Sequence, residues 1–148
     1  MRKDFVRDYA TEMFREYAAL GKPSAELLTR MLSEADITSR SYETNALRTL
    51  LDSYKNAERL SAVMLDIAAV EKTIGQFQKA DKKHIIKAVE AVYFASAKNA
   101  LKKGDISARV RRFALDLPAS EKQVYKWLRE ARLLCAANRG LRIPEVKR

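Results

Sequence analysis

The chain has 148 residues and a formal net charge of +10, with one cysteine (Cys135) and one histidine (His84). This length supports one domain or two small ones, and so few cysteines and histidines exclude a disulfide framework and a Cys/His metal cluster. No stretch approaches the roughly 20 apolar residues of a membrane span, and the first residues carry no apolar signal core, so we expect a soluble, cytoplasmic protein.

The N-terminal segment is predicted to form two helices. Apolar residues recur at helical spacing between residues 3 and 20, and Gly21 is suited to end this helix because glycine adopts the left-handed conformation easily. Ser24 is positioned to cap a second helix that runs to about Ala35. The small polar residues of 36–41 then predict a loop.

The segment 42–79 contains no proline and carries two apolar stripes. The stripes do not stay in register across Lys55 to Arg59, so either one long helix carries a phase shift there or two helices meet there. The second stripe has near-heptad spacing and fits a dimer seam as well as a helix buried in its own domain. The first stripe comprises Leu47, Leu50, Leu51 and Tyr54, and the second comprises Leu60, Val63, Ile67, Val70, Ile74 and Phe77.

A change of composition near Asp81 marks the boundary between two predicted domains, 1–80 and 81–148. Asp81 is predicted to cap a helix that runs to about Leu101, after which Gly104 ends that helix and Asp105 caps the next. No segment shows the pattern of a strand. We therefore expect an all-α fold in which a helical bundle that serves oligomerisation or partner binding precedes a basic C-terminal module.

Two helices joined by a tight turn are predicted between Arg109 and Leu134. Ser120 stands three residues before Gln123, as in a capping box, where the serine hydroxyl accepts a hydrogen bond from the backbone N–H of Gln123. Beyond it, apolar residues at steps of three and four share one helix face, and basic residues lie on the opposite face. The apolar residues are Val124, Trp127, Leu128, Ala131, Leu134 and Cys135; those of the preceding helix are Val110, Phe113, Ala114 and Leu117.

This segment resembles the helix-turn-helix superfamily of DNA-binding proteins. Ala114 matches the small residue at the contact between the two helices, Phe113 matches the first apolar anchor, and Val124 matches the branched residue early in the second helix. One position departs from the pattern, because Pro118 stands where glycine is usual and proline cannot take the left-handed conformation. The resemblance extends to sigma factor C-terminal regions and to small regulators of phage or mobile elements.

The excess positive charge lies entirely in the C-terminal part of the chain. Residues 1–80 hold 12 basic and 12 acidic residues, whereas residues 81–148 hold 17 basic and 7 acidic residues. A basic module attached to a neutral one is typical of a nucleic-acid binder, because neutralised phosphates release their counterions. The alternative is a basic surface that serves only solubility.

A recognition helix enters the major groove with its N-terminal residues near the base edges. On this model the helix from Ser120 to Cys135 reads DNA, with Lys126 or Arg129 suited to guanine and Gln123 to adenine. Basic residues outside this helix would bind phosphates and add affinity without sequence information. The predicted DNA-reading residues are Ser120, Lys122, Gln123, Tyr125, Lys126, Arg129 and Arg132, and the predicted phosphate ligands are Lys102, Lys103, Arg109 and Arg112.

Catalysis finds little support in the sequence. Cys135 falls on the apolar helix face, where a structural thiol is the commoner interpretation, and His84 beside Lys82 and Lys83 is expected on the surface. Trp127 is in step with the apolar residues, so we expect it to pack in the core rather than to stack on a base. With no glycine-rich phosphate loop, we expect no enzyme, no cofactor and no metal site.

The predicted function is sequence-specific binding of double-stranded DNA by a transcriptional regulator of phage or mobile-element type. Such a regulator would form a homodimer or a higher oligomer, and its N-terminal helices would join subunits or contact RNA polymerase. Two alternatives remain. The motif could mark a site for DNA packaging or transfer, as in a small terminase subunit, or the basic face could bind an acidic protein instead of DNA.

Overall fold

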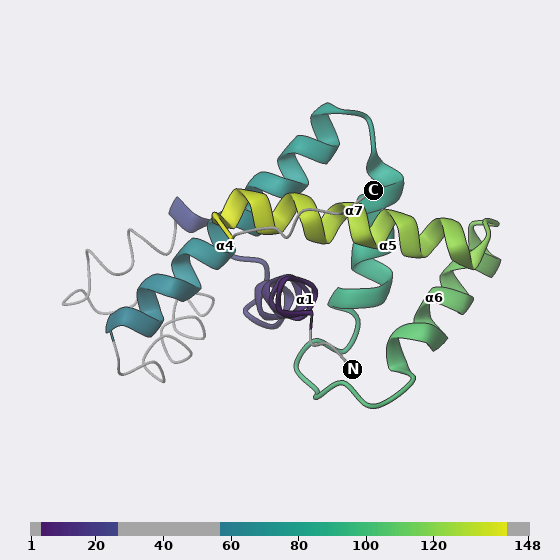
Figure 1. Cartoon of the computed structure of the whole chain (residues 1–148), viewed down its shortest axis with the longest axis horizontal. Helices are drawn as coiled ribbons and strands as arrows, with labels where there is room; N and C mark the ends of the chain where they lie inside the picture. Colours follow the sequence, from purple (N-terminus) through teal and green to yellow (C-terminus); the bar gives the residue numbers. More distant parts are fainter. Residues whose placement is uncertain (1–3, 27–56, 142–148) are drawn as a thin grey trace.

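The computed structural model of the protein describes residues 4–26 and 57–141, and every regular element in this part is helical (Figure 1). The all-α fold class is therefore confirmed for these residues. None of the described helices combines the length and the apolar character that a membrane span needs. The helices are α1 (Phe5–Ala19), α4 (Ala57–Lys79), α5 (Lys83–Val89), which continues into a π-helical segment (Glu90–Phe94), α6 (Asp105–Asp116) and α7 (Glu121–Arg139).

Helix α1 forms between two local signals. The backbone N–H of Arg7 donates to the Asp4 carboxylate at 2.9 Å, which caps the first turn. At the other end Gly21 has a φ of 86°, and the N–H of Lys22 donates to the Tyr17 carbonyl at 2.9 Å. The predicted end of this helix is confirmed. The predicted helix from Ser24 is described only as far as residue 26, and the predicted loop and first apolar stripe lie outside the described residues.

Helix α4 buries the second apolar stripe within the chain. Val63, Ile67, Val70 and Phe77 are each at most 4 % exposed and belong to one core cluster with residues of α1 and α7. The sequence predicts either a dimer seam or a helix buried in its own domain for this stripe. These four residues are buried within their own chain. Leu60 lies outside the part whose side chains are described.

The predicted N-cap at Asp81 is wrong. Asp81 has a φ of 58°, and the N–H of Lys82 donates to the Phe77 carbonyl at 2.8 Å, so Asp81 belongs to the turn that closes α4. An N-cap residue needs an extended backbone, which a residue in the left-handed region cannot supply. Helix α5 accordingly begins at Lys83 without a side-chain cap.

The helix that follows Asp81 is shorter than predicted. It ends at Phe94 instead of near Leu101, and the chain turns at Ser96, whose φ is 50°. The guanidinium of Arg15 on α1 is buried and donates to the carbonyls of Ala97 and Asn99, just beyond this end. A tertiary contact thus satisfies backbone carbonyls that lie beyond the end of the helix.

Gly104 precedes α6 as predicted, with a left-handed φ of 87°. Asp105, however, is the first residue of the helix instead of its N-cap, and its carboxylate accepts from the backbone N–H of Lys102 at 2.8 Å. The aspartate therefore fastens the preceding loop, and its negative charge still lies in the first turn of α6, where the helix dipole favours it.

Helix α7 is the central element of the described structure. It contacts α1, α4, α5 and α6, and Figure 1 shows it running across the molecule, with α1 seen nearly end-on and the turn to α6 at the right-hand end. One core cluster contains residues from both sides of the predicted boundary at residues 80 and 81. The division into an N-terminal and a C-terminal domain stays a prediction.

Candidate nucleic-acid interface

The turn between α6 and α7 closes without any left-handed residue. Only Leu117 to Ser120 separate the two helices, and none of these four residues has a positive φ. The N–H of Ala119 donates to the Ala114 carbonyl at 2.8 Å, which closes the turn around Pro118. The structure thus accommodates proline by a turn that needs no glycine.

The predicted N-cap of α7 is present. The backbone N–H of Gln123 donates to the Ser120 hydroxyl oxygen at 3.0 Å, and Ser120 has the extended backbone of a cap residue. This bond fixes where α7 begins and therefore which residues form its exposed first turns.

We expect Ser120→Ala to lower the free energy of unfolding by about 1 kcal/mol, because the Gln123 N–H loses its acceptor. Urea denaturation followed by circular dichroism would measure the change. Ser120→Asn, which restores a capping oxygen, should recover most of the loss; a Ser120→Ala protein as stable as the wild type would show that the cap is dispensable.

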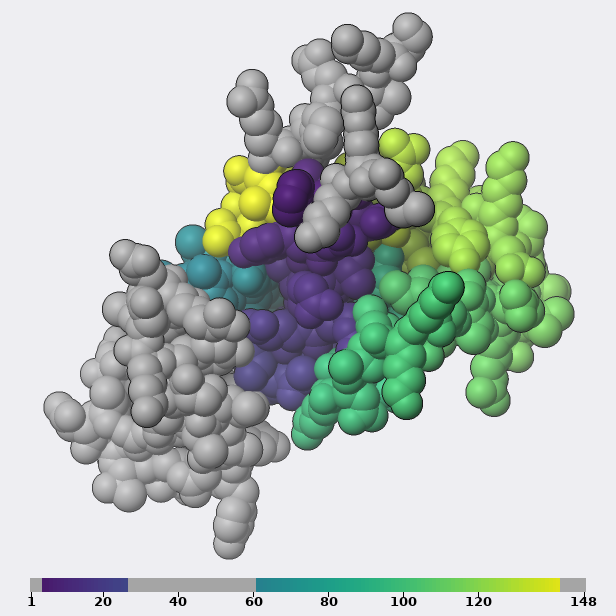
Figure 2. All heavy atoms as spheres, turned by 60° about the horizontal axis from the view of Figure 1, so that its bottom comes forward, coloured from purple at the N-terminus to yellow at the C-terminus, as the bar shows by residue number. Residues whose placement is uncertain are grey.

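The two faces of α7 separate as predicted. Val124, Leu128, Ala131 and Cys135 are each 0 % exposed. On the other side Lys122, Gln123, Lys126 and Arg129 are exposed, and Tyr125 is 41 % exposed on the flank. Figure 2 shows side chains of the N-terminal part of α7, coloured yellow-green, projecting from the right-hand side of the molecule in that view.

Trp127 lies on the edge of the buried face. It is half-buried against the core, and its ring meets His84 edge-on with 4.8 Å between ring centroids. The predicted packing of Trp127 against the core is confirmed. The expectation for His84 needs correction, because this residue is half-buried beside the indole instead of standing free on the surface.

Two of the predicted basic site residues are engaged within the chain. Arg109 donates from Nη1 to the Val92 carbonyl at 3.0 Å, and Arg132 donates from Nη1 to the Tyr93 hydroxyl at 2.7 Å. Both side chains are half-buried. The sequence pattern does not reveal such partners, because it shows that a residue is basic but not what lies opposite it.

The other predicted phosphate ligands are exposed. Lys102 and Lys103 lie in the loop before α6, and Arg112 lies on α6 itself. Arg111, which is not among the predicted phosphate ligands, is also exposed. Its position next to Arg112 is a signal that the sequence already contained. The four residues add positive charge to the segment that leads into α7.

The C-terminal half of α7 is anchored to α4. Arg139 Nε donates to Asp66 Oδ1 at 2.7 Å, and the two side chains are only 19 % and 15 % exposed. Asn138 donates from Nδ2 to the Thr73 hydroxyl at 2.9 Å and to the Gln76 side-chain carbonyl at 2.8 Å. These bonds hold one end of the helix whose other end carries the exposed basic residues.

Cys135 is buried, as its position on the apolar face of α7 predicts. Burial raises the pKa of its thiol to about 12, although a hydrogen bond with Thr73 opposes part of the change. A thiol that stays protonated at neutral pH is a poor nucleophile and a poor metal ligand. Nothing about this residue therefore supports a reaction.

This raised pKa predicts a pH dependence of stability. Above pH 9 the unfolded thiol ionises while the folded one does not, so the unfolded state binds fewer protons and stability falls as the pH rises towards 12. Between pH 8 and pH 10 the wild type should lose about 1 kcal/mol more than Cys135→Ala. Parallel pH profiles in urea would contradict the prediction.

No family model, curated protein or solved structure matches the chain.

Proposed function

We propose that the protein binds double-stranded DNA, with α7 in the major groove and α6 beside the phosphate backbone. The observation that carries the proposal is the separation of the two faces of α7. The centre of one face is fully buried, and the other face presents Lys122, Gln123, Lys126 and Arg129 to solvent from a helix with a fixed start. An exposed, capped helix with basic and amide side chains is what major-groove recognition requires.

The geometry of α7 suits a single contact with the groove. Lys122, Lys126 and Arg129 follow one another at steps of four and three, so they form one stripe about 10 Å long at 1.5 Å per residue. The major groove is about 12 Å wide and admits a helix. Lys126 or Arg129 would donate to guanine. The Gln123 side chain would form two hydrogen bonds with adenine, one as donor and one as acceptor.

The surrounding residues would hold the backbone. Lys102, Lys103 and Arg112 are exposed and would pair with phosphates, which sets the position of α7 without adding sequence information. Arg109 and Arg132 each hold one intramolecular hydrogen bond, so only their remaining N–H groups would be available for DNA. Ser120 retains its hydroxyl hydrogen as a donor, because its oxygen is the acceptor in the cap.

In this proposal the protein is a transcriptional regulator of phage or mobile-element type that acts in the cytoplasm as a homo-oligomer. A dimer would place two copies of α7 on half-sites about one turn of DNA apart, and its site would be palindromic. Such symmetry ties the oligomeric state directly to the DNA sequence that is bound.

The test is a selection of bound duplexes from a random pool with the full chain, combined with light scattering to measure the oligomer. An enriched palindrome, a dimer and an affinity that falls steeply with salt are expected. A ring-like oligomer would point to DNA packaging instead. Failure to retain duplex DNA at low salt would overturn the proposal, and retention without any enriched sequence would overturn its specificity.

A further inference from the structure

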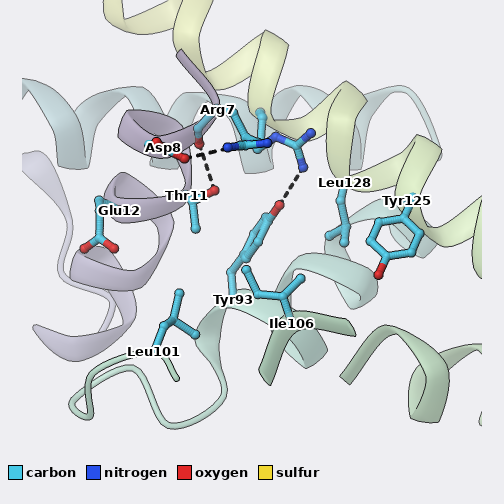
Figure 3. Close-up of a pocket in the computed structure, with 10 residues that line it drawn as sticks. Arg7, Asp8, Thr11, Glu12, Tyr93, Leu101, Ile106, Tyr125 and Leu128 are labelled. Carbon is cyan, nitrogen blue, oxygen red and sulfur yellow. Dashed lines mark hydrogen bonds and ion pairs between the residues drawn. The ribbon is translucent and has the colours of Figure 1, made fainter. Parts of the chain in front are cut away.

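A groove of about 470 Å³ lies along the flank of α7, outside the stripe assigned to DNA. Its walls come from α1, from α6 with the loop before it, and from α7. Figure 3 shows Asp8, Thr11 and Glu12 on the side of α1, Leu128 and Tyr125 on the side of α7, and Leu101, Tyr93 and Ile106 below. Its lining is mixed, with four charged side chains beside the apolar Leu101, Ile106 and Leu128, and its volume lies in the range of small-molecule sites.

The groove contains a cation that has no charged partner among residues 4–26 and 57–141. Arg132 is half-buried, its one hydrogen bond goes to the neutral Tyr93 hydroxyl (Figure 3), and it forms no ion pair with any residue in the described part of the chain. The Tyr93 ring beneath it is 1 % exposed and stacks on Phe14 at 5.7 Å between centroids, so the hydroxyl holds Arg132 at a fixed place. A guanidinium retains several donors arranged for a carboxylate.

The other charges of the groove restrict the ligand. Arg7 is paired with Asp8 at 3.2 Å, and these two largely offset each other. Glu12 lies on the α1 side and would repel a second negative charge. The groove therefore favours a ligand with one carboxylate at one end and an uncharged body.

We propose that this groove binds a small amphipathic monocarboxylate. Its carboxylate pairs with Arg132, and its apolar body lies over Leu101 and Ile106 beside the Tyr125 ring. The groove shares Arg132 and Tyr125 with the residues predicted to contact DNA, but neither the groove nor its test requires the proposed function.

The test uses 5-phenylpentanoate, with 5-phenylpentanol and 5-phenylpentylamine as matched probes of equal shape and different charge. Backbone amide resonances of the full chain are followed by NMR during titration. We expect the acid to bind with a dissociation constant on the order of a millimolar, to shift the resonances of Leu101, Ile106 and Tyr125, and to bind at least about ten times more tightly than the alcohol or the amine.

Four variants, each checked for an unchanged helical spectrum, complete the test. Arg132→Leu should weaken binding of the acid at least about tenfold, whereas Arg111→Leu removes an equal charge from exposed α6 and should leave it unchanged. Ile106→Trp should block the groove with Arg132 intact, and Glu12→Gln should strengthen binding. The proposal is overturned if the acid shifts no groove resonance at 10 times the expected dissociation constant, on the order of 10 mM, if the amine binds as tightly, or if Arg132→Leu has no effect.

Discussion

Replacing Lys126 and Arg129 together with alanine is expected to lower the affinity for a selected duplex by about a hundredfold or more. Both side chains are exposed and lie one turn apart on α7. A good contact to a base edge contributes about 1–3 kcal/mol of discrimination, so losing two removes most of the preference for the selected site. The remaining binding should keep most of its salt dependence, because the residues assigned to the phosphates are unchanged.

A matched control separates this effect from simple loss of charge. Lys72→Ala with Lys79→Ala removes the same two charges from exposed positions of α4, away from the α6–α7 turn, and should change the affinity only slightly. The helical circular dichroism of both double variants should match the wild type, since no core residue changes. Unaltered affinity in the Lys126 and Arg129 variant, or an equal loss in the control, would contradict the assignment of α7 as the recognition helix.

The features that the sequence predicts well are those determined by neighbours in the chain. The Ser120 cap depends on a residue three positions away, and the left-handed Gly21 depends only on the lack of a side chain. The buried face of α7 follows from the helical period, which places Val124 and Leu128 on one side. Each of these signals lies within one or two turns of helix, so no tertiary information is needed.

The predictions that failed are those in which a distant residue, or the turn that ends the preceding helix, decides the outcome. Apolar residues continue in the sequence after Phe94, which favours a longer helix. The helix nevertheless ends at Phe94, and Arg15 of α1 donates to the carbonyls of Ala97 and Asn99 just beyond it. Asp81 has the chemistry of a cap, yet the end of α4 places it in the left-handed region. Composition cannot distinguish an aspartate that begins one helix from an aspartate that closes the helix before it.

The sequence predicts which face of α7 is exposed, but it does not predict the contacts that hold α7 in place. The period of α7 placed Lys126 and Arg129 opposite the apolar residues, and both are exposed. The hydrogen bond from Arg132 to Tyr93 spans 39 positions of sequence, and the pair of Arg139 with Asp66 spans 73. No spacing rule reaches that far. DNA binding by these residues stays a prediction.

Replacing Asp66 with alanine is expected to lower the free energy of unfolding by about 3 kcal/mol. Asp66 Oδ1 accepts from Arg139 Nε at 2.7 Å and from the Tyr9 hydroxyl at 2.9 Å, so one carboxylate joins α1, α4 and α7. Its removal leaves the guanidinium of Arg139, which is 19 % exposed, without an ionic partner. The cost is large because a mostly buried charge that loses its partner cannot be fully hydrated.

The control for this variant is a second ion pair of α7. Glu130 pairs with Lys82 at 2.8 Å, but the two side chains are 42 % and 45 % exposed, so Glu130→Ala should cost at most about 1 kcal/mol. Urea denaturation of both variants and of Tyr9→Phe, which removes one hydrogen bond to a charged carboxylate worth about 1.5–3 kcal/mol, ranks the three contacts. Equal losses for Asp66→Ala and Glu130→Ala would mean that burial does not set the strength of these pairs.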